Sequence, residues 1–173
     1  SETTFVVGYE KDAIIAETKS FDGTIHIAEQ KKAIGTSDAV KSALPSITKP
    51  CNVLVLYGDV PLIKQDTLEK LITETKDGLT ILSTIIDSPY GYGRVKKDNE
   101  GYAQAIVEEK DASDSEKQIK EVFTGILCCK KELLEEAINE VGNDNAAGEY
   151  YLTDIVSIIS SKGYKINSCV VSN

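Results

Sequence analysis

One short run of the sequence, residues 53–62, constrains the fold more than any other, because it joins an apolar strand to a carboxylate. Its first four residues are β-branched or aliphatic and too few for a helix, so they predict a strand buried on both faces, as in a parallel sheet. Tyr57, Gly58 and Asp59 follow at the carboxyl end, where open α/β sheets bind ligands. Gly58 allows close backbone approach, Asp59 can ligate a hard cation, and Pro61 ends the strand. By itself, the run also fits a turn with a helix-capping aspartate.

Strand-like and helix-like segments alternate along the whole chain. Strands are expected at 3–7, 24–28, 53–56, 79–86, 94–97, 102–108, 122–129 and 166–171, and helices at 11–18, from 36, at 65–75, at 131–141 and from 155. Such alternation predicts an α/β domain with a mostly parallel, mixed sheet and helices on both faces. The segments on either side of the turn at 98–101 predict an antiparallel hairpin within it.

Composition limits the classes of partner. The chain has 173 residues, enough for one domain, and a formal net charge of −9, so no basic stripe is present to bind nucleic acid or an anionic membrane. Its four cysteines lack a CxxC spacing, which favours reduced thiols in a cytoplasmic protein. The chain contains no methionine and starts at Ser1, as expected of an interior part of a longer protein.

Two further loops carry polar residues that could bind a ligand. Gly35 stands directly before Thr36, which can cap a helix whose free N–H groups favour an acceptor-rich ligand. Glu108 and Glu109 stand at the end of the second strand of the hairpin. Judged by spacing alone, a Gly-Thr pair is more often an ordinary loop than a binding site, and two glutamates at this position are more often a solvated strand end.

Six motifs occur together in one order and spacing: EQKKAIGTSDAV, VLYGDVPLI, SPYGYGRV, IVEEKDAS, VFTGIL and NAAGEYYLTDIV. In this combination the chain resembles the uridyltransferase domain of the bacterial N-acetylglucosamine-1-phosphate uridyltransferases, over nearly its whole length. The resemblance implies a Rossmann-like nucleotidyltransferase fold in a single domain, residues 1–173, lacking the family's N-terminal glycine-rich loop and its C-terminal end. In that family a left-handed β-helix that acetylates glucosamine-1-phosphate usually follows.

The resemblance also implies which residues bind the nucleotide and the metal. The uracil end of the nucleotide would be held by Gln30, Gly35 and Thr36, with Tyr57 and Gly58 from the YGD motif completing the nucleotide-binding set. Asp59, the aspartate of that motif, would be the catalytic residue that ligates Mg²⁺. A bound cation would explain how an acidic chain handles polyanionic substrates.

On the sugar side, the resemblance assigns the pocket to Gly93, Glu108, Phe123, Tyr151 and Thr153. Glu108 would accept hydrogen bonds from sugar hydroxyls. Phe123 stands where the family usually has an asparagine that contacts the sugar, and a phenyl ring can neither donate nor accept that bond. This departure leaves the sugar preference open.

The implied reaction transfers UMP from UTP to N-acetylglucosamine-1-phosphate, giving UDP-N-acetylglucosamine for cell-wall synthesis (peptidoglycan and lipopolysaccharide), and pyrophosphate. The chain alone is expected to be inactive, and the full-length protein could be a homo-oligomer. Two alternatives stay open: another sugar-1-phosphate nucleotidyltransferase, or a non-catalytic module that binds nucleotide sugars.

Overall fold

The structure, a computed structural model, describes residues 2–60, 62–76 and 78–171, so Pro61, the residue predicted to end the strand at 53–56, lies outside the described residues. The strands are β1 Glu2–Val7, β2 Thr24–Glu29, β3 Asn52–Val55, β4 Leu79–Ile85, β5 Arg94–Lys97, β6 Ala103–Val107, β7 Glu121–Lys130 and β8 Asn167–Val171. The helices are α1 Lys11–Thr18, α2 Thr36–Ala43, α3 Gln65–Thr75, α4 Lys131–Glu140 and α5 Asp154–Ser161, with short 3₁₀ turns η1 Leu44–Ser46 and η2 Glu116–Gln118. The predicted alternation of strands and helices is confirmed.

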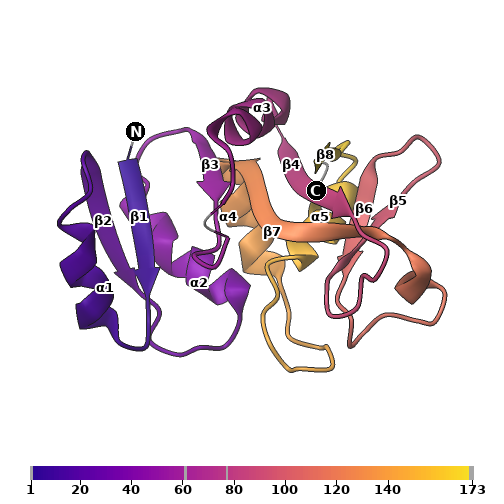
Figure 1. Cartoon of the computed structure of the whole chain (residues 1–173), viewed down its shortest axis with the longest axis horizontal. Coiled ribbons are helices and arrows are strands. Elements are labelled where there is room, and N and C mark those ends of the chain that lie inside the picture. The colour runs from indigo at the N-terminus through magenta and orange to yellow at the C-terminus, as the bar shows by residue number, and fades with distance from the viewer. Residues whose placement is uncertain (1, 61, 77, 172–173) are drawn as a thin grey trace.

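The chain begins with a strand–helix–strand unit at one end of the molecule (Figure 1). β1 and β2 pair in parallel, from Glu2 opposite Thr24 to Val7 opposite Glu29, and α1 connects them. α2 then packs against both strands and against α4, and so joins this unit to the rest of the fold.

A six-stranded mixed sheet forms the centre, in the order β6-β5-β7-β4-β8 with β3 also paired to β7 (Figure 1). β4 and β8 run parallel, whereas β7 runs antiparallel to β3, β4 and β5. These pairings give β3, β4, β5 and β8 one common direction and reverse β6 and β7. The expected mixed sheet with a hairpin at β5 and β6 is confirmed. The expectation that it is mostly parallel is wrong: among the described residues β4–β8 is its one parallel pairing, because β7 lies among strands of the opposite direction and pairs antiparallel with β3, β4 and β5.

The strand predicted at 53–56 differs from expectation in its surroundings. β3 ends at Val55, pairs antiparallel with β7, and has half-buried side chains over residues 53–55. Leu56, expected within the buried strand, is 47% exposed. The reason is that β3 lies at an edge of the sheet. In the part of the chain that the structure describes, β7 is the one strand paired with β3, and an edge strand buries less of its side chains than a central strand does.

Helices cover both faces of the sheet, as predicted. The larger core cluster joins α4 and α5 to one face, and the smaller joins α3 to the other. Cys129 belongs to the first cluster and its neighbour Cys128 to the second, which confirms that they point to opposite faces. None of the helices in the described ranges is long and apolar enough to span a membrane.

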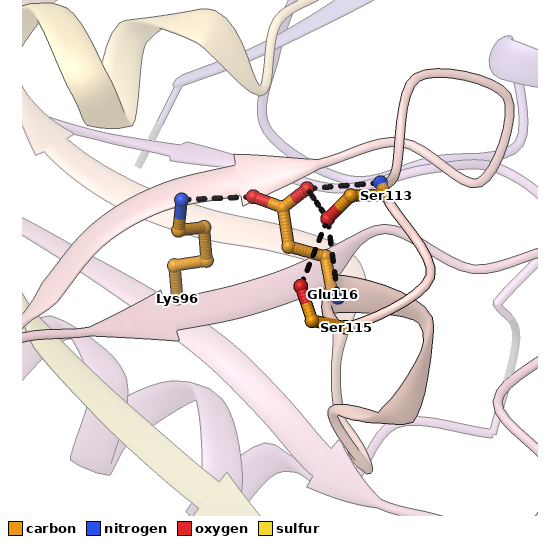
Figure 2. A network of polar contacts seen from close by, with 4 residues as sticks. All are labelled: Lys96, Ser113, Ser115 and Glu116. Carbon is orange, nitrogen blue, oxygen red and sulfur yellow. Dashed lines mark hydrogen bonds and ion pairs between the residues drawn. The ribbon is translucent and has the colours of Figure 1, made fainter.

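The charged connection between β6 and β7 is held by one carboxylate. Glu116, at the start of η2, accepts hydrogen bonds from the Ser113 main-chain N–H (3.0 Å) and hydroxyl (2.7 Å) and pairs with Lys96 Nζ at 2.8 Å. Figure 2 shows the Glu116 carboxylate between Lys96 on β5 and the Ser113 turn. The bond to Lys96 is the main cause that lowers the pKa of Glu116 to about 2. The pair therefore fixes this connection to the hairpin with an ionised carboxylate.

Candidate functional site

The segment before α2 contains a glycine, Gly35, that allows close contact with the main chain of Tyr150. Gly35 adopts φ 137° and ψ 167°, a conformation that residues with a side chain rarely adopt. A Cβ atom here would lie 2.3 Å from the main-chain oxygen of Tyr150. That contact exists because the Tyr150 N–H donates to Ile34 O (2.9 Å) and its oxygen accepts from the Ser37 N–H (2.9 Å). The predicted nucleotide loop is thereby attached to the segment that carries Tyr151 and Thr153.

The Gln30 side chain stabilises the loop before α2 through two hydrogen bonds. Its Nε2 donates to the Gly35 oxygen at 2.9 Å and to Asp38 Oδ2 at 3.0 Å. Both donor bonds of the carboxamide are thus used to hold the loop in shape, and the carboxamide oxygen is the atom suited to accept a bond from a ligand. Contact between Gln30 and a nucleotide stays a prediction.

Thr36 serves a purpose different from the predicted helix cap. The cap residue of α2 is Gly35, and α2 has no side-chain cap. The Thr36 hydroxyl instead accepts a hydrogen bond from the Leu152 N–H at 2.9 Å, and it lowers the pKa of the neighbouring Tyr57 hydroxyl. A hydroxyl shared between two neighbouring segments is unavailable to its own helix, which explains the difference.

Tyr57 lies at the junction of the predicted nucleotide and sugar sides. Burial is the main cause that raises the pKa of its hydroxyl, opposed by the bond to Thr36. The negative charges of Glu108 and Asp59 raise that pKa further, so both carboxylates lie within electrostatic reach of one hydroxyl. Tyr57 is therefore the residue at which the two predicted halves of the site meet.

Gly125 on β7 makes room for this tyrosine. Its φ is 85°, and a Cβ at this position would lie 2.7 Å from Cδ2 of the Tyr57 ring. Sequence reasoning did not assign Gly125 to the site, although a glycine inside a strand pattern signals a close approach by another group.

Asp59 follows β3 and is exposed, as is the neighbouring Gly58. Within residues 2–60, 62–76 and 78–171, no group of three or more histidine, cysteine, aspartate or glutamate side chains could hold a metal ion. Magnesium sites that also bind phosphates need only one or two carboxylates, with substrate oxygens and water completing the shell. A single accessible carboxylate at a strand end fits that type of site, and the role of Asp59 as a ligand stays a prediction.

The hairpin brings Gly93 and Glu108 together. Arg94 at the start of β5 pairs with Val107 at the end of β6, so the residues just outside this pair are neighbours. Gly93 is buried, and a Cβ there would lie 2.7 Å from the Ile106 side chain and 3.4 Å from Glu108 Oε1. A side chain at position 93 would intrude beside the Glu108 carboxylate, so the glycine keeps this carboxylate accessible.

Glu108 is partly buried and hydrogen-bonded. Burial raises its pKa, against the lowering effect of the Thr153 hydroxyl, which donates to Oε1 at 2.9 Å. Burial also raises the pKa values of Tyr151 and Asp154 nearby, and the charge of Glu108 contributes to both shifts. The structure therefore brings together three of the predicted sugar-side residues, Glu108, Tyr151 and Thr153, in one acidic, hydroxyl-containing environment.

Two of these residues, Glu108 and Tyr151, line a surface cavity of about 390 Å³, within the range typical of small-molecule sites. Its lining is Tyr90, Gly91, Glu108, Glu109, Lys110, Ala147, Glu149 and Tyr151. Tyr90, Glu109 and Glu149 were not assigned to the site from the sequence, although all three lie inside the motifs that carried the resemblance. Another cavity of about 420 Å³, between Pro50, Lys130, Glu132, Leu133, Glu136 and Tyr164, contains none of the predicted site residues.

Phe123 lies in the core. Its side chain is 7% exposed and belongs to the larger hydrophobic cluster. Its main-chain N–H donates to the Gly93 oxygen at 2.9 Å, so this position supports the site through its backbone. A contact between the phenyl ring and a sugar stays a prediction that the burial does not favour.

Comparison with known proteins gives a consistent pattern. Residues 4–172 match the family described as "Nucleotidyl transferase". The chain is 47% identical over 153 residues to the bifunctional protein GlmU of Francisella philomiragia, covering 88% of this chain and 33% of that protein. It is 45% identical over 145 residues to the GlmU of Acinetobacter baumannii, covering 83% of this chain and 32% of that one. The chain thus spans about a third of the length of these relatives.

Solved structures share the fold at low sequence identity. A UDP-glucose pyrophosphorylase complexed with UDP-glucose superposes with a TM-score of 0.72 at 13% identity, covering 98% of this chain and 72% of that one. A nucleoside-diphosphate-sugar pyrophosphorylase from Vibrio cholerae gives a TM-score of 0.70 at 14% identity, covering 100% of this chain and 74% of that one. These similarities confirm the Rossmann-like nucleotidyltransferase fold.

Proposed function

The chain belongs to the nucleotidyl transferase family, and on this premise we propose that it forms the substrate-binding part of a sugar-1-phosphate uridyltransferase. The reaction proposed for the full-length protein is transfer of UMP from UTP to N-acetylglucosamine-1-phosphate. A phosphate oxygen of the sugar phosphate forms a bond to the α-phosphorus of UTP, the bond from that phosphorus to the bridging oxygen breaks, and pyrophosphate leaves. The GlmU relatives support this choice of substrates.

One observation carries the proposal: Tyr57 joins the two halves of the site. Its ring lies over Gly125 of β7. Thr36, from the loop proposed to hold the nucleotide, lowers the pKa of its hydroxyl, and the charges of Glu108 and Asp59 raise it. Two reactants bound on either side of this tyrosine would meet beside Asp59. Holding two reactants in one orientation supplies much of the rate enhancement for phosphoryl transfer, because the sugar phosphate is already a nucleophilic anion.

Asp59 is the residue proposed to hold a magnesium ion. When bound, the ion supplies positive charge that offsets the repulsion between the phosphates of the two reactants. The chain's own contribution is to place one carboxylate at the end of β3, with Gly58 beside it leaving the backbone open to the phosphates.

The sugar would bind over Glu108, and its replacement tests this. Glu108→Gln is expected to raise the KM for N-acetylglucosamine-1-phosphate about 10- to 100-fold, because a hydrogen bond to a charged acceptor contributes about 1.5–3 kcal/mol. The KM for UTP is expected to change less than two-fold. Steady-state kinetics of the full-length protein measures both, with Glu132→Gln, an exposed glutamate on α4, as the matched control. Equal changes in both KM values would contradict a sugar-specific role.

Glu108→Gln, which is expected to weaken binding of the sugar phosphate, is expected to stabilise the fold near neutral pH. Because burial raises the pKa of Glu108, the folded state binds its proton more tightly than the unfolded chain. The stability linked to that proton is present at low pH and is lost as the pH rises through the folded pKa. Glu108→Gln stays neutral, so its Tm is expected to exceed that of the wild type at pH 7–8, with the difference vanishing below about pH 4. A lower Tm at pH 8 would show that ionised Glu108 stabilises the fold.

Binding by the chain itself tests the proposed function directly. Calorimetric titration with UDP-N-acetylglucosamine, with and without magnesium, is expected to show magnesium-sensitive binding. Loss of that binding in Gly93→Val, which fills the space beside Glu108, would place the ligand in the proposed pocket. If neither the chain nor the full-length protein binds this ligand, the assignment fails.

A second candidate is a transferase for another sugar 1-phosphate, and the observation that favours it is Phe123. Its buried ring offers no hydrogen bond to a sugar substituent. Turnover of glucose-1-phosphate, galactose-1-phosphate and N-acetylglucosamine-1-phosphate by the full-length protein separates the two candidates.

We also propose a cytoplasmic location, which the four cysteines support: all four are free thiols, and Cys128, Cys129 and Cys169 are buried.

A further inference from the structure

A buried arginine is paired with a residue that lines the proposed sugar pocket. Arg94, the first residue of β5, is 2% exposed and is one of the largest fully buried side chains. Its Nη2 pairs with Glu109 Oε2 at 2.6 Å, and its Nη1 donates to the main-chain oxygen of Tyr92. Among the described residues, its Nε is buried without a hydrogen-bond partner.

Glu109 connects this arginine to the glycine-rich loop before β5. The same oxygen that binds Arg94 also accepts the Gly91 N–H at 3.2 Å. The bond from Arg94 lowers the pKa of Glu109, so the carboxylate is held ionised. Two contacts from one side chain therefore fix the loop at residues 88–93 to the end of β6.

The two segments joined in this way are those that form the pocket. The loop contributes Tyr90 and Gly91 to the cavity and Gly93 beside it, and the end of β6 contributes Glu108 and Glu109. Glu109 lies in the turn that follows β6 and binds Arg94, while its neighbour Glu108 accepts the Thr153 hydroxyl. Both side chains line the cavity, and the two residues are consecutive in the chain. The direction of Glu108 thus depends on where Glu109 is held.

We propose that the Arg94–Glu109 pair positions Gly93 and Glu108 for recognition of the sugar phosphate. The inference rests on the proposed function and adds two positioning residues to it. In this role, the Arg94 guanidinium and the Glu109 carboxylate do not have to contact the sugar. They keep the loop at a fixed distance from the end of β6, so that the Glu108 carboxylate is in place before the ligand binds.

Stability alone explains this pair poorly. Buried ion pairs can often be replaced by apolar side chains of similar size without loss of stability, because removing two charges from water offsets their attraction. The buried Nε without a partner among the described residues adds a further penalty. The Arg94 side chain is 2% exposed and that of Glu109 20%, so desolvation of the arginine offsets part of the attraction within the pair. Because the pair also connects two pocket segments, positioning explains it better than stability does.

The test uses Glu109→Gln in the full-length protein. Glutamine keeps the size of the side chain but removes the charge that holds Arg94. The KM for the sugar phosphate is expected to rise about ten-fold, since small displacements of binding groups have large effects on recognition. The KM for UTP is expected to stay within two-fold. Faster hydrogen exchange at the Gly91 amide, measured on this chain, would show that the loop has been released.

The hairpin itself offers a matched control. Lys96, also on β5, forms a second ion pair with Glu116 of η2 at 2.8 Å (Figure 2). This pair connects β5 to η2 and not to the segments that form the pocket. Glu116→Gln removes one charge in the same way and is expected to leave both KM values unchanged. An equal rise in the KM for the sugar phosphate in Glu109→Gln and Glu116→Gln would overturn the inference, because general loosening of the hairpin would then explain it.

A double variant covers the case in which Glu109→Gln misfolds. Arg94→Met with Glu109→Leu replaces the pair by apolar side chains, and it is expected to fold with a Tm close to that of the wild type while the KM for the sugar phosphate still rises. A folded double variant with an unchanged KM would overturn the positioning role alone. A wild-type protein without any turnover of UTP and the sugar phosphate would overturn the proposed function, and this inference with it.

Discussion

Replacement of Asp59 by asparagine is expected to reduce magnesium-dependent turnover of the full-length protein about 10²- to 10³-fold. The amide oxygen keeps the shape of the side chain but lacks the charge that binds a hard cation, and a metal contributes several kcal/mol to stabilising the transition state. Since each 1.36 kcal/mol corresponds to a ten-fold change in rate, about 3–4 kcal/mol accounts for this loss. The Tm is expected to change little, because Asp59 is exposed.

Initial rates at several magnesium concentrations would measure this effect. Asp22→Asn, in the exposed turn between α1 and β2, removes the same charge far along the chain and is expected to keep full activity. The apparent Kd for magnesium should rise in Asp59→Asn alone. Full activity of that variant, or an equal loss in Asp22→Asn, would remove Asp59 from the metal site.

Gly35→Ala is expected to lower the free energy of unfolding by about 2–6 kcal/mol. A backbone conformation restricted to glycine contributes about 1–3 kcal/mol of this, and overpacking in a tight contact about 1–3 kcal/mol more. The added methyl group would lie 2.3 Å from the Tyr150 oxygen and 2.5 Å from its nitrogen. Because these are main-chain atoms, relief of the clash must move the 150–153 segment away from the loop.

Urea unfolding of this chain, followed by circular dichroism, measures the loss. Gly142→Ala is the matched control, since a Cβ at position 142 meets no atom within 4 Å. That control is expected to change the unfolding free energy by less than about 0.5 kcal/mol. A native stability for Gly35→Ala would mean that the two segments are not packed as the structure shows. Where the variant still folds, weaker binding of UDP-N-acetylglucosamine is also expected.

The secondary structure was largely predictable from the sequence, because its signals are local. The apolar face of α4 and the strand at 122–129 follow directly from the period of their hydrophobic residues, and the hairpin follows from the turn at 98–101. The environment of β3 was not predictable in the same way. An apolar run indicates a strand, but its burial depends on how many neighbours it acquires.

In the candidate site, too, the sequence identified residues, but their surroundings depended on the tertiary structure. Glycines at 35 and 93 could be recognised from the motifs, yet the reasons for them are contacts made by folding: the Tyr150 main chain for Gly35, and the Ile106 side chain beside Glu108 for Gly93. The alternative of Glu108 as a solvated strand end was excluded only by its burial and by Thr153, 45 residues later. No period or spacing in the sequence predicts such a pair.

The sequence by itself determined the family, the order of helices and strands, and the residues proposed to bind the nucleotide, the metal and the sugar. Only the tertiary structure decided that Tyr57 packs over Gly125 between the two predicted halves of the site, that Phe123 is a core residue, and that Arg94 pairs with Glu109, which lines the cavity. The physical reason is that helix and strand preferences act over a few residues. Burial, pKa shifts and ion pairs depend instead on groups that folding brings together from distant parts of the chain.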